Sequence, residues 1–249
     1  MNKIYPIETG RFLQMQKTNF TYTRNQGDII QASVLMFLIE TPTRLIAVDT
    51  GGSGEAWARE HHHPLVRTED MVPDRAVEKL GFSPKDVSVI VNTHLHWDHA
   101  TNNDLFPNAE IYVQKKEVEY ALDPLPIHYT YYESPAIGLT PPWFSSLNRM
   151  KLIWGDLDLG EGIKLLHLPG HTPGFQGVAV ETAEGEVLLA GDCLPLYENW
   201  QAYGPLKYLP SGIHGDLFEY YKTLERIESM NVRIIPGHDT QVSEITCIG

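Results

Sequence analysis

The chain is acidic: its 249 residues carry a formal net charge of -13 at pH 7, and 42% of them are hydrophobic. Such a charge repels nucleic-acid phosphates and anionic lipid headgroups, so we expect neither a nucleic acid nor a membrane as a partner. The length suits one domain spanning residues 1–249 with a substantial core. The best apolar run, Val34–Ile39, is too short to cross a bilayer, and the first residues lack the apolar core of a signal peptide. We therefore expect a cytoplasmic protein that binds a small-molecule substrate, with a homodimer left open.

Apolar runs bounded by glycine, proline and acidic residues predict β-strands along most of the chain. Ser33–Glu40 and Leu45–Asp49 are separated by Thr41-Pro42-Thr43, which predicts two strands joined by a turn. Val87–Val91 predicts the strand that leads into the richest motif of the sequence. Further strands are predicted at Ala109–Val113, Leu152-Ile153, Ile163–Leu168, Gly177–Val180, Val187–Ala190 and Val232–Ile235.

Three segments predict helices. Asp74–Leu80 has helical spacing with Asp74 as its cap, and Lys115–Leu122 is a second helix. Asp216–Met230 is the clearest, because Asp216 and the residue three positions later have capping-box spacing ahead of an apolar stripe. Strands, a helix, more strands and a final helix suit two sheets packed face to face with helices outside, although the pattern alone gives only a mixed α and β class.

The segment THLHWDHA follows the predicted strand at residues 87–91 and contains four metal-competent side chains within six residues: His94, His96, Asp98 and His99. In an extended or turning backbone, residues two apart share a side. We therefore expect His94, His96 and Asp98 to converge on one point while His99 turns away. Such an arrangement suits two metal ions side by side.

Three more candidate ligands follow, each at the end of an apolar run. His171 stands in LPGHTPG, Asp192 ends LLAGD, and His238 ends IIPGH. The order HxHxDH, Gly-His, Gly-Asp and Gly-His, from an early AVDTG segment to His238, strongly resembles the metallo-β-lactamase superfamily. The resemblance implies an α+β fold, an αββα sandwich with metals at one edge between the sheets.

The resemblance also implies a role for each candidate ligand. Asp192 would bridge two ions, of which His94, His96 and His171 hold the first and Asp98, His99 and His238 the second. Such nitrogen and oxygen ligands bind zinc tightly and also accept manganese, iron or cobalt. A hydroxide shared by the two ions would attack the substrate carbonyl, and Asp98 would carry the proton to the leaving group.

Within the superfamily the chain is similar to the N-acyl homoserine lactonase group of dinuclear hydrolases. The similarity lies in the segment before Asp49, in the HLHWDH form of the motif and in the insertion between residues 123 and 150. It implies lactone opening, N-acyl homoserine lactones among the candidate substrates, and therefore quorum quenching. That group has a tyrosine three residues after the bridging aspartate. Here the position is Pro195, and the nearest tyrosine, Tyr197, is the candidate in its place.

Other functions remain open on sequence grounds. A thioester hydrolase of the glyoxalase II type and a β-lactamase share the reaction class. A diiron redox protein is disfavoured because His96 stands where such relatives have glutamate. A non-catalytic metal-binding module would fill the same ligands but leave no open pocket beside them.

Several neighbouring residues have two interpretations. Asp49 occupies the place of an acid that orients a metal-ligand histidine, although an aspartate before Thr-Gly-Gly is also a common turn residue. His61-His62-His63 resembles a metal site, but we expect a solvated loop because consecutive side chains do not converge. We expect Asp239 to be a cap or loop residue and Cys193 a small buried hydrophobe.

The segment at about 123–150 predicts an irregular flap over the metals. Its aromatic residues could hold an acyl tail or ring of the substrate, or they could anchor a long loop to the core. The candidates for substrate binding are Tyr131, Tyr132, Trp143 and Phe144.

Overall fold

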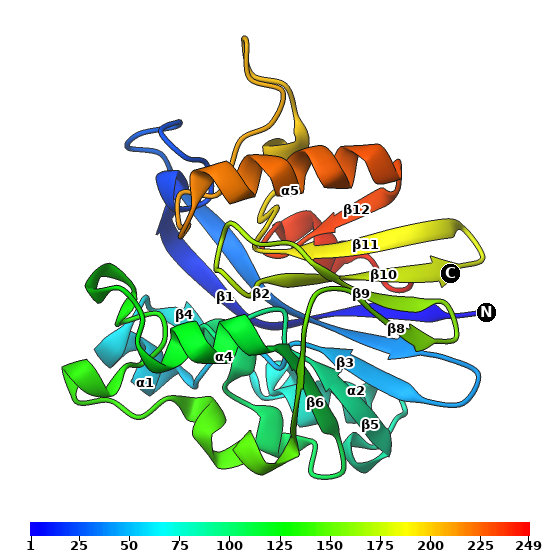
Figure 1. The fold of residues 1–249 in the computed structure, drawn as a ribbon. Helices are drawn as coiled ribbons and strands as arrows, with labels where there is room; N and C mark the ends of the chain where they lie inside the picture. The colour runs from blue at the N-terminus through cyan, green and yellow to red at the C-terminus, as the bar shows by residue number, and fades with distance from the viewer.

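The computed structural model describes residues 1–249 and contains two β-sheets that pack face to face (Figure 1). The larger sheet has the strand order β4-β1-β2-β3-β5-β6-β7. Its strands are β1 (Lys3–Gln16), β2 (Ile29–Glu40), β3 (Leu45–Val48), β4 (Leu65–Val66), β5 (Val87–Val91), β6 (Glu110–Gln114) and β7 (Met150–Ile153). The smaller sheet has the order β12-β11-β10-β9-β8. Its strands are β8 (Leu157–Gly160), β9 (Ile163–His167), β10 (Gln176–Thr182), β11 (Gly185–Gly191) and β12 (Arg233–Pro236).

Both sheets are mixed. In the larger sheet β1 pairs antiparallel with β4 and β2, and β2 with β3, whereas β3, β5, β6 and β7 run parallel. In the smaller sheet only the β11–β12 pair is parallel. Parallel neighbours end at the same end of a sheet, so the loops after β11 and β12 lie close together.

Strand β2 shows why the sheets pack as they do. Residues 34–39 are apolar and buried on both faces of the sheet. Leu35, Phe37 and Ile39 join the cluster between the two sheets. Met36 and Leu38 face the other way and join a second cluster beneath α2. The alternation of period two therefore fills two layers of core from one strand.

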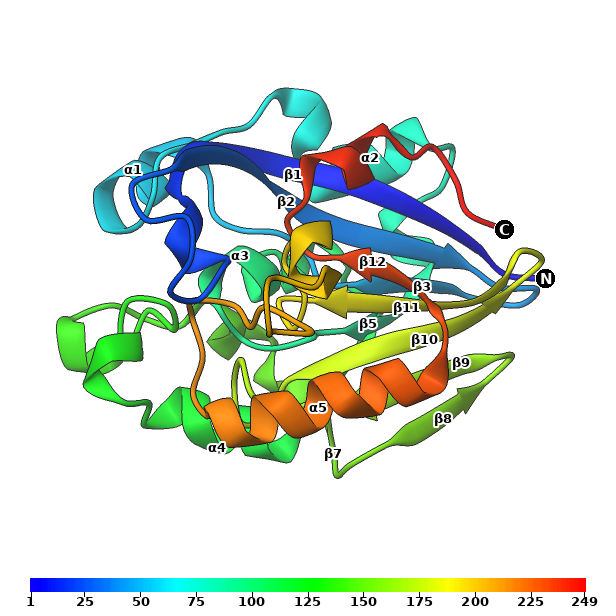
Figure 2. The same ribbon diagram turned by 90° about the horizontal axis from the view of Figure 1, so that it is seen from above.

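Five α-helices cover the sandwich or its end: α1 (Glu55–His61), α2 (Pro73–Lys79), α3 (Trp97–Ala100), α4 (Lys115–Leu122) and α5 (Leu217–Met230). Figures 1 and 2 show α5 along the outer face of the smaller sheet, where Tyr220, Leu224 and Ile227 are buried against it. Helices on the outer faces of two mixed sheets confirm the predicted α+β architecture. None of these helices is both long and apolar enough to cross a membrane.

The predicted helix starts differ in accuracy. The side chain of Asp216 accepts hydrogen bonds from two backbone N–H groups in the first turn of α5, as a cap should. For α2 the prediction was wrong, because the helix begins at Pro73 and Val72 is its N-cap. Proline suits the first helical position, since its missing N–H would have no partner there.

Strand β1, the longest in the protein, was not predicted from the sequence. Its pairing with β2 shifts register between Glu8 and Gly10 and again between Phe12 and Met15. Each shift changes which residues face the core, so polar and apolar residues do not alternate regularly. The short β4 and β8 and the helix α1 were also missed.

The insertion at 123–150 is built mainly from short 3₁₀ turns at Pro126–His128, Pro135–Ile137 and Pro142–Arg149. It lies beside α4 and α3, at the end of the sandwich away from the two chain termini (Figure 2). The candidate site lies at this same end.

Candidate metal centre

The seven predicted ligand side chains gather at one end of the sandwich. Each follows a strand: the HLHWDH motif follows β5, His171 follows β9, Asp192 follows β11 and His238 follows β12. They form three groups whose ligand atoms lie within 4.8 Å of one another. The groups are His94, His96 and His171; His94, His99 and Asp192; and Asp98, His99 and His238.

The grouping corrects one expectation from the motif. Asp98 does not converge with His94 and His96; it lies with His99 and His238. The reason is local structure, because α3 begins at Trp97. Helical geometry replaces strand alternation after His96, so residues two apart no longer share a side.

Asp192 lies between the group of His94, His96 and His171 and the group of Asp98, His99 and His238. Its Oδ1 lies 3.0 Å from Nε2 of His238 and 3.2 Å from Nε2 of His99. Its Oδ2 lies 3.5 Å from Nε2 of His171. One carboxylate therefore reaches histidines of both groups, which is the arrangement required of a bridging ligand.

Two glycines allow the loops after β11 and β12 to approach this closely. A Cβ added to Gly237 would lie 2.6 Å from the carbonyl carbon of Gly191, so a side chain does not fit there. Gly191 itself has a left-handed backbone with φ of 50°. The Gly-Asp and Gly-His pairs of the sequence thus place Asp192 and His238 side by side.

The donor set fits metal ions. The Nε2 atoms of His94, His96 and His99 and Oδ1 of Asp192 are buried and form no hydrogen bond. Buried polar atoms are almost always satisfied, so four orphaned atoms facing one space indicate a missing partner. Imidazole nitrogens and carboxylate oxygens are the ligands that zinc and similar divalent ions prefer.

The charge states agree with this fit. Burial lowers the pKa of His94 and His96 well below the usual range, and that of His171 to about 4, so these imidazoles are neutral and can coordinate a metal. Burial also disfavours charge on His99, but the carboxylates of Asp192 and Asp98 outweigh it and raise its pKa well above the usual range. Metal binding at His99 must therefore displace a proton.

Hydrogen bonds at Nδ1 determine the ring orientation of three of the histidines, His99, His171 and His238. Nδ1 of His99 lies 2.8 Å from Oδ2 of Asp49, as expected for an acid that orients a ligand histidine. Nδ1 of His171 lies 2.8 Å from the Ile213 carbonyl, and Nδ1 of His238 lies 2.7 Å from the Ser33 carbonyl. Because oxygen only accepts in these contacts, each Nδ1 carries the hydrogen, and the lone pair of Nε2 faces the site.

The buried carboxylate of Glu117, on α4, was missed by sequence reasoning. It accepts hydrogen bonds from Leu95 N at 3.0 Å and from Thr172 Oγ1 at 2.6 Å. Leu95 lies inside the HLHWDH motif and Thr172 follows His171, so Glu117 ties two ligand-bearing loops together. Its only sequence signal is a charged residue on the otherwise apolar face of a short helix.

Comparison with known proteins agrees with this geometry. Residues 30–238 match the family model described as the metallo-β-lactamase superfamily. An N-acyl homoserine lactonase of a Bacillus species is 30% identical and covers 97% of this chain and 94% of its own length. The N-acyl homoserine lactonase AiiA of Bacillus thuringiensis subsp. kurstaki is 32% identical over 81% of this chain and 79% of its own length.

The chain belongs to the metallo-β-lactamase superfamily. Solved structures of the superfamily agree over the same span. An N-acyl homoserine lactone hydrolase with the product N-hexanoyl-L-homoserine bound at its catalytic metal centre matches with a TM-score of 0.76 and 26% identity. That match covers 97% of this chain and 95% of the other. In such structures a small molecule lies at the metal centre.

A small cavity of about 40 Å³ lies beside the candidate metal ligands of this metallo-β-lactamase superfamily member. His96, Asp98, Asp192 and His238 lie on its wall. The remaining wall is largely apolar and aromatic: Phe12, Met15, Phe20, Trp97, Tyr131 and Ile213, with Asn19, His63 and Ser211. Sequence reasoning missed Phe12, Met15 and Phe20, because the strand β1 that delivers the first two was not predicted.

The flap aromatics divide between the two interpretations. Tyr131 lies on the cavity wall. Tyr132 and Trp143 have no exposed surface and belong to a buried cluster with α4, and Phe144 packs against that cluster. Tyr131 therefore fits the substrate-binding interpretation, and the other three fit the anchoring interpretation. They anchor the flap to the core.

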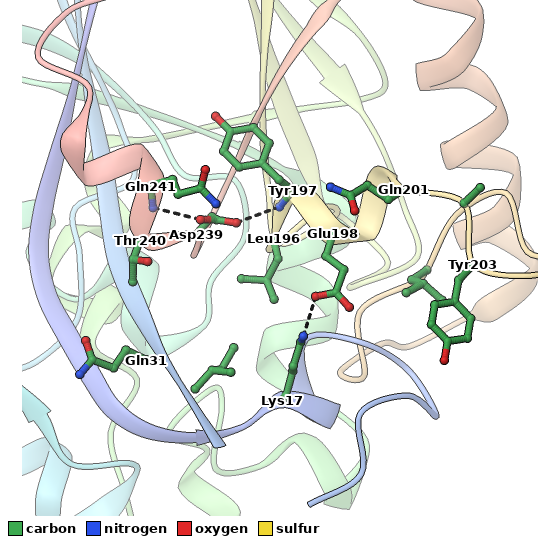
Figure 3. Close-up of a pocket in the computed structure, with 13 residues that line it drawn as sticks. Lys17, Gln31, Leu196, Tyr197, Glu198, Gln201, Tyr203, Asp239, Thr240 and Gln241 are labelled. Atoms are coloured by element: carbon green, nitrogen blue, oxygen red, sulfur yellow. Dashed lines mark hydrogen bonds and ion pairs between the residues drawn. The ribbon is translucent and has the colours of Figure 1, made fainter. Parts of the chain in front are cut away.

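Tyr197 is not at the metal centre. It lies on a separate, more open hollow of about 580 Å³ that contains none of the seven ligands (Figure 3). Its ring extends away from the side chain of Leu196, and its backbone N–H donates to Asp239 (Figure 3). The prediction that Tyr197 contacts a substrate carbonyl at the metals was wrong. Asp239 is a capping residue, as expected.

The three consecutive histidines also differ from the expected solvated loop. The side chain of His62 is buried, and its Nε2 lies 2.7 Å from Oε1 of Glu133 in the flap. Its ring stacks on Trp97 with a centroid separation of 4.0 Å. His63 lies on the cavity wall. Cys193, in contrast, is buried in an apolar cluster, as predicted.

Proposed function

We propose that this protein is a dinuclear zinc hydrolase that opens lactones, with N-acyl homoserine lactones as the first substrates to test. The observation that carries the proposal is that the carboxylate of Asp192 lies close to His171 on one side and to His99 and His238 on the other, beside a cavity with a largely apolar and aromatic wall. The names of the relatives support the substrate class. The metal-ligand roles are those of the sequence prediction.

Two divalent ions bound here would polarise the ester carbonyl and lower the pKa of a bound water. The groups of His94, His96 and His171 and of Asp98, His99 and His238 would hold these ions, and the hydrogen bonds at Nδ1 of His99, His171 and His238 orient those imidazoles toward the site. Asp98 lies on the cavity wall as well as in the group with His99 and His238, so it can pass a proton to the departing alcohol oxygen. No serine or cysteine nucleophile is required.

The apolar part of the wall supports an acyl or alkyl substituent on the ring. Phe12, Met15 and Phe20 come from the N-terminal part of the chain and Ile213 from the segment before α5, and together they form an apolar surface next to Asp192. A hydrocarbon tail placed there would leave water, at roughly 0.8 kcal/mol per buried methylene. The lactone ring would then lie toward Asp98.

The test combines metal analysis with a hydrolysis screen over lactones, thioesters and β-lactams. We expect two ions per chain, lactone opening that chelators abolish, and recovery with zinc, manganese or cobalt. In oxygen-18 water a single turnover should place the label directly in the product carboxylate. Activity that survives complete metal removal, or label appearing first on the protein, would contradict the mechanism. A thioester or a β-lactam turned over faster than every lactone would replace the substrate class.

A further inference from the structure

Tyr131 brings an unused hydrogen-bond donor to the cavity wall. Of the polar wall residues outside the ligand set, Ser211 is already engaged, since its Oγ donates to the carbonyl of Asn19 at 3.1 Å. The hydroxyl of Tyr131 forms no hydrogen bond with another protein group. A free hydroxyl beside the metal ligands is available to a bound substrate.

The place of Tyr131 relative to the ligands is defined by packing. Its ring lies against His96 with a centroid separation of 5.2 Å. The ring of Tyr131 therefore lies beside His96, a member of the group that also contains His94 and His171. A tyrosine phenol is protonated at neutral pH, so the hydroxyl of Tyr131 can donate a hydrogen bond.

The backbone of Tyr131 is attached to the ligand motif itself. The N–H of Trp97, which lies between His96 and Asp98 in the chain, donates to the Tyr131 carbonyl at 2.8 Å. The N–H of Tyr131 donates to the carbonyl of His128 at 3.0 Å. The flap residue thus keeps a fixed position relative to two metal ligands.

The two residues that follow Tyr131 anchor it further. The hydroxyl of Tyr132 donates to the buried carboxylate of Glu117 at 2.8 Å. Oε1 of Glu133 accepts from Trp57 Nε1 at 2.7 Å and lies 2.7 Å from Nε2 of His62. Donors that act in catalysis must be held in place before the reaction begins, and this stretch of the flap meets that condition.

We propose that Tyr131 is a catalytic residue. Its phenol donates a hydrogen bond to the carbonyl oxygen of the lactone, which becomes negatively charged when the carbonyl carbon is attacked. This role rests on the lactonase function proposed above. No bond to Tyr131 forms or breaks, and the proton stays on the phenol throughout. The hydrogen bond strengthens as charge develops on the substrate oxygen, so it lowers the barrier more than it tightens substrate binding.

The test is Tyr131→Phe, with Tyr129→Phe as the matched control. Phenylalanine keeps the ring against His96 and removes only the hydroxyl. We expect Tyr131→Phe to retain two metal ions per chain and the wild-type unfolding temperature. Its kcat on a lactone should fall by roughly 100-fold, with KM changed less than about threefold. Tyr129, a flap tyrosine away from the cavity wall, should give wild-type kinetics when changed to phenylalanine.

A binding measurement gives a second readout that does not depend on turnover. Calorimetric titration with the ring-opened product N-hexanoyl-L-homoserine should show a Kd roughly tenfold higher for the metal-loaded Tyr131→Phe variant than for Tyr129→Phe. If the wild type opens lactones and Tyr131→Phe keeps its kcat and Kd within twofold, the role of Tyr131 is refuted and the lactonase function stands. If the wild type neither opens lactones nor binds the product, both proposals are refuted.

Discussion

Thr172 Oγ1 donates a hydrogen bond of 2.6 Å to Oε2 of Glu117, which joins the loop after β9 to α4. Gly174 N donates to the same oxygen at 3.2 Å. The other oxygen of Glu117 accepts from Leu95 N and from the hydroxyl of Tyr132. Four donors therefore converge on one fully buried carboxylate. The metal-ligand loops depend on this residue for their relative position, although it touches no ligand atom.

Glu117→Gln should destabilise the protein by about 3 kcal/mol. An amide presents its own NH₂ to two of the four donors, so at least one buried donor loses its acceptor. The measurement is urea unfolding of the metal-free protein, followed by metal titration of the folded variant, which should show weaker binding. Glu119→Gln, an exposed change on the same helix, is the control and should alter stability by less than about 0.5 kcal/mol. Equal stability of the two variants would contradict the bracing role of Glu117.

The ligand set was predictable from sequence for a physical reason. His94, Asp192 and His238 each follow a strongly apolar strand, and the strand ends of such a sandwich meet at one edge. A strand is recognisable from its apolar pattern, so the position of a ligand directly after the strand can be predicted as well. The order of the ligands along the chain then carries the resemblance to the superfamily.

The residues that were missed have no such local signal. Glu117 is one charged residue on a helix, and only its tertiary partners reveal that it is buried. His62 lies two residues before Pro64 in a polar stretch, yet its ring is buried against Trp97 and Glu133, which are both distant from it in sequence. Tyr197 was chosen by its distance along the chain from Asp192. The loop after β11 turns it into a different hollow instead.

His62→Ala should destabilise the protein, contrary to what a solvated loop would show. The change removes the stack on Trp97 and leaves the buried carboxylate of Glu133 with only Trp57 as a hydrogen-bond donor. We expect a loss of about 2–3 kcal/mol in the free energy of unfolding, measured by urea denaturation. His61→Ala is the control, because that ring does not reach Glu133. A cost for His62→Ala no larger than for His61→Ala would restore the loop interpretation.

Trp143→Ala tests the anchoring role of the flap. Trp143 is fully buried in the cluster with α4, so its removal leaves a large cavity and should cost about 3–5 kcal/mol. Because Trp143 does not lie on the cavity wall, KM for lactones should stay near the wild-type value in the folded fraction of the variant. Thermal unfolding and steady-state kinetics at low temperature separate the two effects. A large rise in KM without loss of stability would place Trp143 in contact with the substrate instead.

The ion pair between Asp156 and Arg226 should make a pH-dependent contribution to stability. Partial burial raises the pKa of Asp156, but hydrogen bonds from Arg226 and from His167 N outweigh it and lower the pKa below its usual value. A carboxylate whose pKa is lower in the folded state stabilises the fold above its unfolded pKa of about 3.9, and the contribution is lost as pH falls through the folded pKa. Asp156→Asn should therefore cost about 0.5–1 kcal/mol at pH 7 and progressively less below about pH 3.9. Metal-free protein must be used, so that ligand protonation does not obscure the effect. A cost that grows as the pH falls would have the wrong sign.

Asp192→Ala tests the bridge at the centre of the site. The carboxylate lies within 3.5 Å of His171 in one group and of His99 and His238 in the other. Its removal should therefore lower the metal content toward one ion per chain or less and abolish lactone opening. Metal content is measured by mass spectrometry after dialysis against metal-free buffer, and near-ultraviolet circular dichroism checks that the variant is folded. Asp70→Ala, in which an exposed carboxylate far from the ligands is removed, should keep two ions and full activity. A folded Asp192→Ala protein that retains two ions and turns over lactones at the wild-type rate would show that another group holds the ions together.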